Sequence, residues 1–276
     1  MALLVPTFVL ANTDDAVSPD VVSPKLEQPE VETPADVTDS HWGIGFGAGW
    51  INDYPGAAQG RMRYIAVPTY KGKNITIDRQ EGVRGDLVSE SSVKFSISFS
   101  FLFPTDSDDI PIRKGMPDLD WTLQLGPELQ IFLYRSPTHT MFIRLPFRFV
   151  ASTDFSHRFN SQEWNFAPSL RNLFYLKNGR GEIGTRLELD YASESFNDYF
   201  FEVRPQFQTP TRRTYDAREG LMGTTIGLNY SYYEVYPWIY FIGANVYFYG
   251  DAKNRDSPLL QKSVNHSVLG GIIRYF

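Results

Sequence analysis

Residues 41–60 read HWGIGFGAGWINDYPGAAQG, and this stretch decides the fold. Between Trp42 and Trp50, every even position is apolar or aromatic and every odd position is glycine. Because the side chains of a strand alternate between its two faces, one face is large and apolar and the other is bare. Four glycines would weaken a strand in a soluble core. They suit a crowded barrel lumen behind a lipid-facing surface, so we predict the first strand of a transmembrane β-barrel, with a turn at residues 52–56.

Composition favours the same class. Hydrophobic residues make up 42 % of the 276-residue chain, yet no run reaches the roughly 18 apolar residues that a spanning helix needs. Aromatic residues make up 15 % and are spread over many segments, as in the lipid-facing strands and interfacial girdles of a barrel. The alternative is a soluble β-sandwich, which would have to solvate the polar faces of five or six such strands. We favour the barrel.

Charge and residue usage exclude several functions. A net charge of −6 provides no basic footprint, so nucleic acid is not an expected partner. The absence of cysteine removes disulfides, thiolate metal sites and cysteine nucleophiles. The four histidines lack metal-ligand spacing, so we predict no metal and no cofactor. His266 and Ser267 are neighbours that would point to opposite faces of a strand and cannot act as a base–nucleophile pair. A triad from distant strands is the remaining enzymatic alternative; we predict a protein that is not an enzyme.

The N-terminal region divides into two parts before the barrel at residues 41–276. Residues 1–11 contain the apolar run LLVPTFVL and then Ala11, which is typical of the end of a signal peptide and its cleavage site. Residues 12–40 are acidic, bear prolines and almost lack aromatic residues. They cannot bury enough apolar area to offset chain entropy, so we expect a disordered periplasmic tether.

Alternating segments recur from residue 41 onward and predict about twelve antiparallel strands. In the clearest, residues 93–103, apolar side chains alternate with Lys94 and three serines. An even count is the rule for such barrels, and merging two weak segments would give ten. In the last segment we expect Leu269, Ile273 and Tyr275 to face outward. The other predicted strands cover residues 42–50, 62–71, 75–88, 121–134, 141–149, 164–176, 182–191, 199–207, 221–233, 238–249 and 264–276.

The strand count also predicts which connections share a side of the membrane. With an even number of strands, both chain ends face the periplasm. Residues 104–117, 151–162 and 191–198 then fall in the periplasm, and residues 52–61, 205–220 and 250–264 fall outside. The connection at residues 104–117 is long for a periplasmic turn. It is a candidate docking loop for a soluble partner, with a merely solvated loop as the alternative; its charged residues are Asp106, Asp108, Asp109, Arg113 and Lys114.

Charged residues on the predicted inward faces form the other candidate site. They could line a selective pore, or they could pair across the lumen and plug it. A barrel of about twelve strands is intermediate between side-chain-filled and open barrels, and the presence of both signs favours a largely closed lumen. We expect the glycines of residues 43–49 to leave room for the three arginines. The residues are Lys94, Glu128, Arg144, Arg148, Arg186, Glu188 and Asp190.

Short motifs across residues 41–276 resemble the MipA/OmpV family. They comprise a loop after the first strand, the segment 64–73 with its central Pro68, and two loops near the C-terminus. The resemblance implies an outer-membrane barrel that scaffolds peptidoglycan (murein) synthesis and hydrolysis, with a lytic transglycosylase (MltA) and a penicillin-binding protein as partners. It implies no catalytic residues. A small channel or uptake barrel, or a surface antigen or adhesin, is the alternative. The signature positions, whose role is unknown, are Asp53, Tyr54, Pro55, Gly56, Tyr215, Asp256, Ser257 and Pro258.

Overall fold

The computed structural model describes residues 41–71, 75–78, 82–89, 92–156, 159–176, 179–233 and 237–276. The predicted signal-peptide remnant at residues 1–11 and the tether at residues 12–40 lie outside these ranges.

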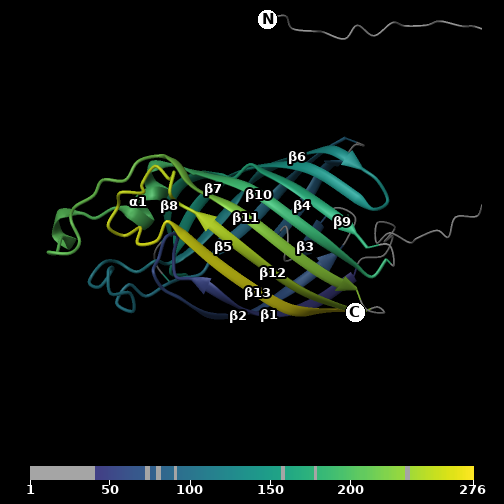
Figure 1. Cartoon of the computed structure of the whole chain (residues 1–276), viewed down its shortest axis with the longest axis horizontal. Coiled ribbons are helices and arrows are strands. Elements are labelled where there is room, and N and C mark those ends of the chain that lie inside the picture. Colours follow the sequence, from purple (N-terminus) through teal and green to yellow (C-terminus); the bar gives the residue numbers. More distant parts are fainter. Residues whose placement is uncertain are drawn as a thin grey trace, which may run out of the picture. The chain divides into compact units, whose positions relative to one another are not determined.

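The described residues form thirteen strands in one antiparallel sheet (Figure 1). The sheet closes on itself, because β13 pairs with β1 and β10 pairs with β11. The strands are β1 (His41–Asn52), β2 (Gly60–Lys71), β3 (Ile75–Asp78), β4 (Gly82–Ser89), β5 (Val93–Leu102), β6 (Trp121–Arg135), β7 (His139–Thr153), β8 (Phe159–Phe166), β9 (Ser169–Tyr175), β10 (Gly181–Ala192), β11 (Gly220–Tyr233), β12 (Trp238–Phe248) and β13 (Val264–Tyr275).

Two of these strands, β8 and β9, are halves of one barrel strand. Both pair with β7 on one side and with β10 on the other, and they are separated by Ala167 and Pro168. Proline has no N–H to donate, yet its carbonyl accepts from the Leu189 N–H at 3.0 Å, and the Ala167 N–H donates to the Pro146 carbonyl at 3.3 Å. The barrel wall is therefore continuous and contains twelve antiparallel strands, the predicted number.

Two segments of that prediction were nevertheless wrong. Residues 75–88, predicted as one strand, form the hairpin of β3 and β4. Residues 199–207, predicted as a strand, contain the end of helix α1 (Glu194–Phe201) and the 3₁₀ helix η1 (Pro205–Phe207). Ser193 begins α1, because its hydroxyl accepts a hydrogen bond from the Phe196 N–H. No helix in the described part of the chain is long and apolar enough to cross a membrane.

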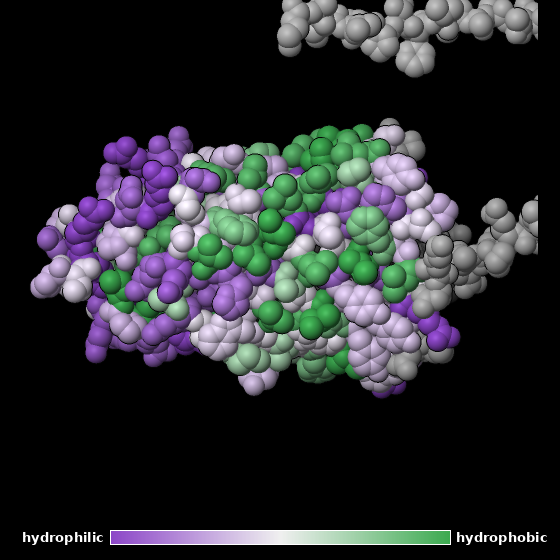
Figure 2. All heavy atoms as spheres, viewed as in Figure 1, coloured by the Kyte–Doolittle hydropathy of each residue, from purple (hydrophilic) through white to green (hydrophobic). Residues whose placement is uncertain are grey.

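The two faces of the strands differ as predicted. Trp42 and Phe46 on β1 are 59 % and 54 % exposed, and Gly45 and Gly47 on either side of Phe46 line the lumen. Figure 2 shows hydrophobic residues over the strands and hydrophilic residues gathered where the long loops and α1 lie, at the left. An apolar outer surface over a closed sheet is what a bilayer requires, since backbone groups are paired within the wall.

A β-bulge changes the direction of one side chain. Asp190 pairs with Gly223 and Tyr191 pairs with Leu221, so Met222 is an extra residue on β11. Strict alternation with the exposed Ile226 and Leu228 would place Met222 on the outer face. The side chain is instead buried inside the barrel mouth, with 3 % exposed.

The last strand has the opposite orientation to the prediction. Ile273 and Tyr275 are buried, and Leu269 and Ile273 line the lumen. Phe276 is 66 % exposed, and the Arg274 guanidinium lies 5.2 Å from the ring centres of both Phe276 and Trp238. An arginine at a membrane interface can lay its chain along aromatic surface and keep its charge in water, which allows it an outward position.

The short and long connections lie at opposite ends of the barrel. The end that carries the C-terminus, here called the terminal end, has the short connection 136–138, and β9 and β11 also end there. The other end, called the loop end, has the long connections 53–59, 103–120, 193–219 and 249–263, with α1 (Figure 1).

The predicted side of residues 104–117 is therefore wrong. The β3–β4 hairpin contributes two strands where one was predicted, which reverses the direction of every later strand up to residue 192. Because the strand predicted at residues 199–207 does not exist, the later strands β11, β12 and β13 again run in the predicted direction. The loop with Asp106, Asp108, Asp109, Arg113 and Lys114 lies at the loop end, away from the C-terminus, as do the connections at 154–158 and 193–219.

Labelling of single cysteines tests this placement, because the chain has no native cysteine. Outer-membrane barrels place short turns in the periplasm and long loops outside. We expect a membrane-impermeant maleimide to label Lys114→Cys on intact cells and Thr138→Cys only after the outer membrane is permeabilised; both side chains are exposed. The reverse pattern would contradict the assignment of the two ends.

Candidate functional site

Four loop-end connections pack together over the mouth of the barrel. We call residues 53–59, 103–120, 193–219 and 249–263 the cap. Their apolar side chains form a buried cluster with Val150 and Met222 from the barrel wall. The cluster members from the cap are Tyr54, Ala57, Ile110, Leu119, Phe196, Phe200, Phe201, Val203, Ala217 and Leu259.

The family-signature positions lie in the cap and join its loops. The Tyr54 hydroxyl donates to the Leu259 carbonyl at 2.7 Å, and the Ser257 hydroxyl donates to the Phe201 carbonyl at 2.7 Å. Burial raises the pKa of Tyr54, so its hydroxyl stays protonated and able to donate. These contacts give the signature residues a structural role in closing the cap.

The other signature positions make similar contacts. Gly56 has φ +77°, and a Cβ there would lie 2.7 Å from Leu260 Cγ. The Tyr215 hydroxyl donates to Asn254 Oδ1 at 3.3 Å, and the Asp256 carbonyl accepts from Arg213 at 2.9 Å. The Asp53 carboxylate pairs with Arg61 at 2.5 Å. Pro55 lines the luminal cavity that lies beneath the cap. Pro258 lies in the turn between Ser257 and Leu259.

The predicted docking residues mostly hold the cap together. Arg113 is buried, donates to the Phe200 carbonyl at 3.1 Å and to Ser107 Oγ at 3.2 Å, and lies 5.5 Å from the centre of the Tyr54 ring. Two contacts shape the loop itself, because Asp106 accepts from the Asp108 N–H and Asp108 accepts from the Gly115 N–H. Asp109 pairs with Arg61 on β2, and the Lys114 side chain is exposed. A loop committed in this way at the loop end does not present a periplasmic docking surface.

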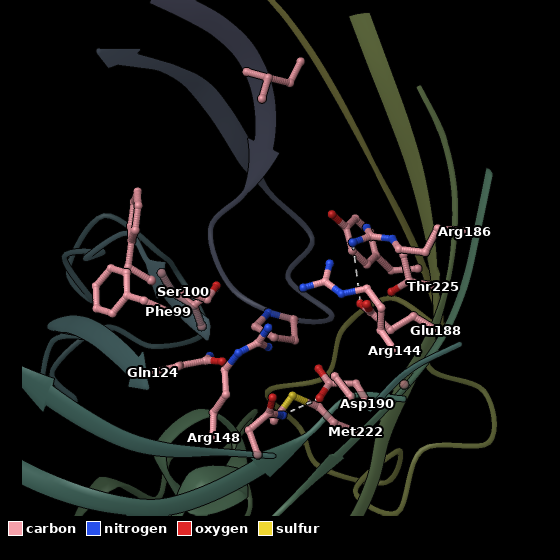
Figure 3. Close-up of a pocket in the computed structure, with 18 of the residues that line it drawn as sticks. Phe99, Ser100, Gln124, Arg144, Arg148, Arg186, Glu188, Asp190, Met222 and Thr225 are labelled. Carbon is pink, nitrogen blue, oxygen red and sulfur yellow. Dashed lines mark hydrogen bonds and ion pairs between the residues drawn. The ribbon is translucent and has the colours of Figure 1, made fainter. Parts of the chain in front are cut away.

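Beneath the cap, the lumen holds a cavity of about 500 Å³ lined by most of the predicted inward charges (Figure 3). Glu128 on β6 is fully buried and receives two hydrogen bonds from Arg144 on β7, one of them of 2.9 Å from Nε. Arg148 lies 3.7 Å from the same carboxylate and donates to Ser98 Oγ at 3.1 Å. Glu128 therefore anchors two arginines of the lumen.

A second group of charges lies on β9 and β10. The Glu188 carboxylate is 3.7 Å from Arg186 and 3.8 Å from Arg171, and Asp190 accepts from the Asn165 amide at 2.5 Å. Arg171 was not predicted, because the break at residues 167–168 obscures the alternation of its segment. The signal that could have found it is its register, since Arg171 pairs directly with Arg186. Lys94 is half-buried near the start of β5, close to the terminal end, and does not line this cavity.

The glycines of β1 do not make the space for the arginines, contrary to the prediction. A Cβ at Gly47 would lie 3.5 Å from the Phe241 ring, and one at Gly271 would lie 2.6 Å from it. The glycine beside Arg186 is Gly227 on β11, whose Cβ would lie 3.3 Å from Arg186 Nε. Gly45 and Gly47 line the same cavity, but their bare backbone accommodates an aromatic ring.

The histidine and serine that are neighbours on β13 lie on opposite faces of the strand. His266 points outward and is exposed, while Ser267 is buried in the lumen and its hydroxyl accepts from the Asn245 amide at 3.2 Å. Their opposite directions agree with the strand argument. Within the described ranges, no three His, Asp or Glu side chains are grouped to hold a metal ion.

Replacing Glu128 with Gln should destabilise the barrel. The substitution leaves the Arg144 guanidinium buried without its counter-charge, and breaking such a pair costs about 3–5 kcal/mol. Urea unfolding of the purified protein measures this cost. Glu202→Gln is the matched control, because its partner Arg204 is 61 % exposed and the change should stay within about 1 kcal/mol. Equal effects of the two substitutions would show that the luminal pair is not a major source of stability.

The cap should become less stable as the pH rises from 3.8 to about 6. Burial, with the nearby carboxylates of Glu202, Glu194 and Asp216, raises the pKa of Asp198 in α1 to about 6. The folded cap therefore holds this proton more tightly than an opened cap, and the stabilisation is lost as Asp198 ionises. Hydrogen exchange of α1, corrected for intrinsic rates, should show this loss. Asp198→Asn should abolish it and the exposed Asp251→Asn should not; a dependence that survives Asp198→Asn would assign it elsewhere.

Comparisons with known proteins place the chain among outer-membrane barrels. Two solved structures are similar in outline. A bacterial polysaccharide outer membrane secretin has 7 % sequence identity and a TM-score of 0.38, and the match covers 87 % of this chain and 98 % of that one. The toluene transporter TbuX of Ralstonia pickettii has 9 % identity and a TM-score of 0.34, and the match covers 86 % of this chain and 88 % of that one. These low scores carry no functional argument. No curated protein matches. The family model described as MltA-interacting protein MipA matches residues 44–276, and the chain belongs to this family of outer-membrane proteins.

Proposed function

We propose that the protein is a non-enzymatic outer-membrane barrel that provides an attachment point for murein-acting enzymes on the periplasmic side. Membership of the MipA family is the observation that carries this proposal, because the family description names an interaction with MltA. By the resemblance described above, the partners are a lytic transglycosylase and a penicillin-binding protein.

The closed lumen supports attachment over conduction. The cap places buried aromatic side chains such as Phe196 and Phe200 across the barrel mouth. Below them, Glu128 and Arg144 occupy the lumen as a buried ion pair. A steady aqueous path would have to pass both layers.

The terminal end is the surface that a periplasmic partner would meet. Its connections are short, and exposed residues there include Arg135 and Thr138. The first described residue, His41 at the start of β1, lies at this same end. The cap lies at the other end, which makes its loops a natural control.

Bulky labels on single cysteines test the attachment site without assuming the chemistry of the partner. A polyethylene-glycol maleimide on Thr138→Cys should block capture of a purified lytic transglycosylase. The same label on Lys114→Cys, in the cap, should leave capture unchanged. Deletion of residues 12–40 shows whether the acidic segment adds to the contact. Capture that survives a label on Thr138→Cys and loss of residues 12–40 would contradict attachment at the terminal end.

A small uptake barrel is the second candidate, and the 500 Å³ cavity with its charged wall is the observation that favours it. Conductance of the purified protein in planar bilayers separates the two functions. A closed lumen gives no steady conductance. A steady open level in the unaltered protein would instead favour uptake.

A further inference from the structure

The luminal cavity has one charged wall and one apolar wall. Its volume of about 500 Å³ falls in the range of small-molecule sites. The charged wall comes from β7, β9 and β10 and carries Arg144, Arg148, Arg171 and Arg186 (Figure 3). The apolar wall comes from β1, β12 and β13 and presents glycine backbone with Phe241, Leu269 and Ile273.

The topology sets β7 and β1 across the lumen from each other, while β10 and β12 are separated only by β11. When β8 and β9 are taken as one strand, β1 and β7 are separated by six positions in a ring of twelve. Side chains of β7 that point inward therefore point toward β1. The cap adds Phe196 and Phe200 to the lining of the cavity, together with Met222 of β11.

The charges that line this cavity do not balance. The lining includes four arginines but only two carboxylates, Glu188 and Asp190, while the fully buried Glu128 lies outside the lining. Glu128 is engaged by Arg144 through two hydrogen bonds. Glu188 lies 3.7 Å and 3.8 Å from its two arginines, beyond the usual hydrogen-bond range of about 2.7–3.2 Å.

Two arginines face the cavity with donors that a ligand could use. The Arg148 and Arg186 side chains are 12 % and 26 % exposed, and both line the cavity. A guanidinium has five N–H donors, and carboxylate or phosphate oxygens match its geometry. In a site with little water, such charge-assisted hydrogen bonds gain strength.

We propose that this cavity binds a small amphipathic anion. Its carboxylate or phosphate head group is held by Arg148 and Arg186, and its apolar body lies against Phe241, Leu269 and Ile273. The anion can come from the aqueous phase, as an aromatic carboxylate would, or from the bilayer, as a fatty acid would. This site does not depend on the attachment of murein-acting enzymes.

Calorimetric titration of the unaltered protein in nanodiscs tests the ligand class. The probes are phenylbutanoate, the uncharged phenylbutanol of similar shape, and acetate as a head group without a body. Phenylbutanoate should bind at least about tenfold more tightly than either of the others, which corresponds to about 1.4 kcal/mol. Equal binding of the alcohol would overturn the role of the arginines, and equal binding of acetate would overturn the role of the apolar wall.

A decanoate arm identifies the source of the anion. Binding of phenylbutanoate alone points to an aqueous ligand. Binding of decanoate alone points to a bilayer-derived one, and the comparison of acid with alcohol is then made between decanoate and decanol; either supports the proposal. Absence of binding by both anions would overturn it.

Substitutions locate the site within the barrel. Arg186→Gln and Arg148→Gln should each weaken binding about tenfold, because each removes one charged donor pair. Arg255→Gln is the matched control, since Arg255 lies on the cap surface and donates to the Gly250 carbonyl. Heat-modifiable migration on a gel verifies that each variant is folded. Unchanged binding in the folded double variant Arg148→Gln/Arg186→Gln would overturn the proposal. If the variants do not fold, the comparison of acid with alcohol on the unaltered protein still decides it.

Discussion

Hydrocarbon offers no hydrogen-bond partner to a peptide group, and this constraint determines most of the structure. An unpaired backbone group in the bilayer costs several kcal/mol, so the sheet must close. The pairing of β13 with β1 achieves closure. Even where Pro168 interrupts a strand, the neighbouring backbone groups find partners at 3.0 Å and 3.3 Å. Closure then forces every second side chain of each strand into a shared interior, and the contents of that interior decide what the barrel can do.

The interior is neither an open channel nor an ordinary apolar core. Burial of Arg144 would be very costly without Glu128, which is itself fully buried and also accepts from Gln130 at 2.7 Å. Arg186 and Glu188 line the same cavity as Arg144 but remain partly exposed, at 26 % and 19 %. The polar wall is thus tightly paired at Glu128 and loosely paired at Glu188. That difference separates charges that stabilise the barrel from charges that could meet a ligand.

Period-2 alternation predicted the fold class, the lumen-facing charges and most of the strands, because in a closed sheet each strand has one face in lipid and one in the lumen. It failed where local signals outweigh periodicity. Ser193 followed by Glu194 is a helix N-terminus, and attention to it would have removed the false strand at residues 199–207. At residues 75–88 one strand was predicted where two exist, and at residues 199–207 one was predicted where none exists, so the total number of strands was correct. The strands between the two errors were predicted in the wrong direction, and residues 104–117 were therefore placed at the wrong end.

The cap could not be predicted from periodicity, since its contacts join residues far apart in the chain. Tyr54 and Leu259 are separated by 205 positions, and their hydrogen bond exists only because the loops after β1 and β12 meet at one end of a closed barrel. Correct strand directions are therefore a precondition for reading the signature motifs together. Once they are read together, the motifs describe a buried apolar cluster above a charged cavity. An aqueous path through the loop end would expose that cluster to water. The cap therefore opposes free conduction, while the lumen beneath it keeps arginine donors largely buried, where charge-assisted hydrogen bonds are stronger than in bulk water.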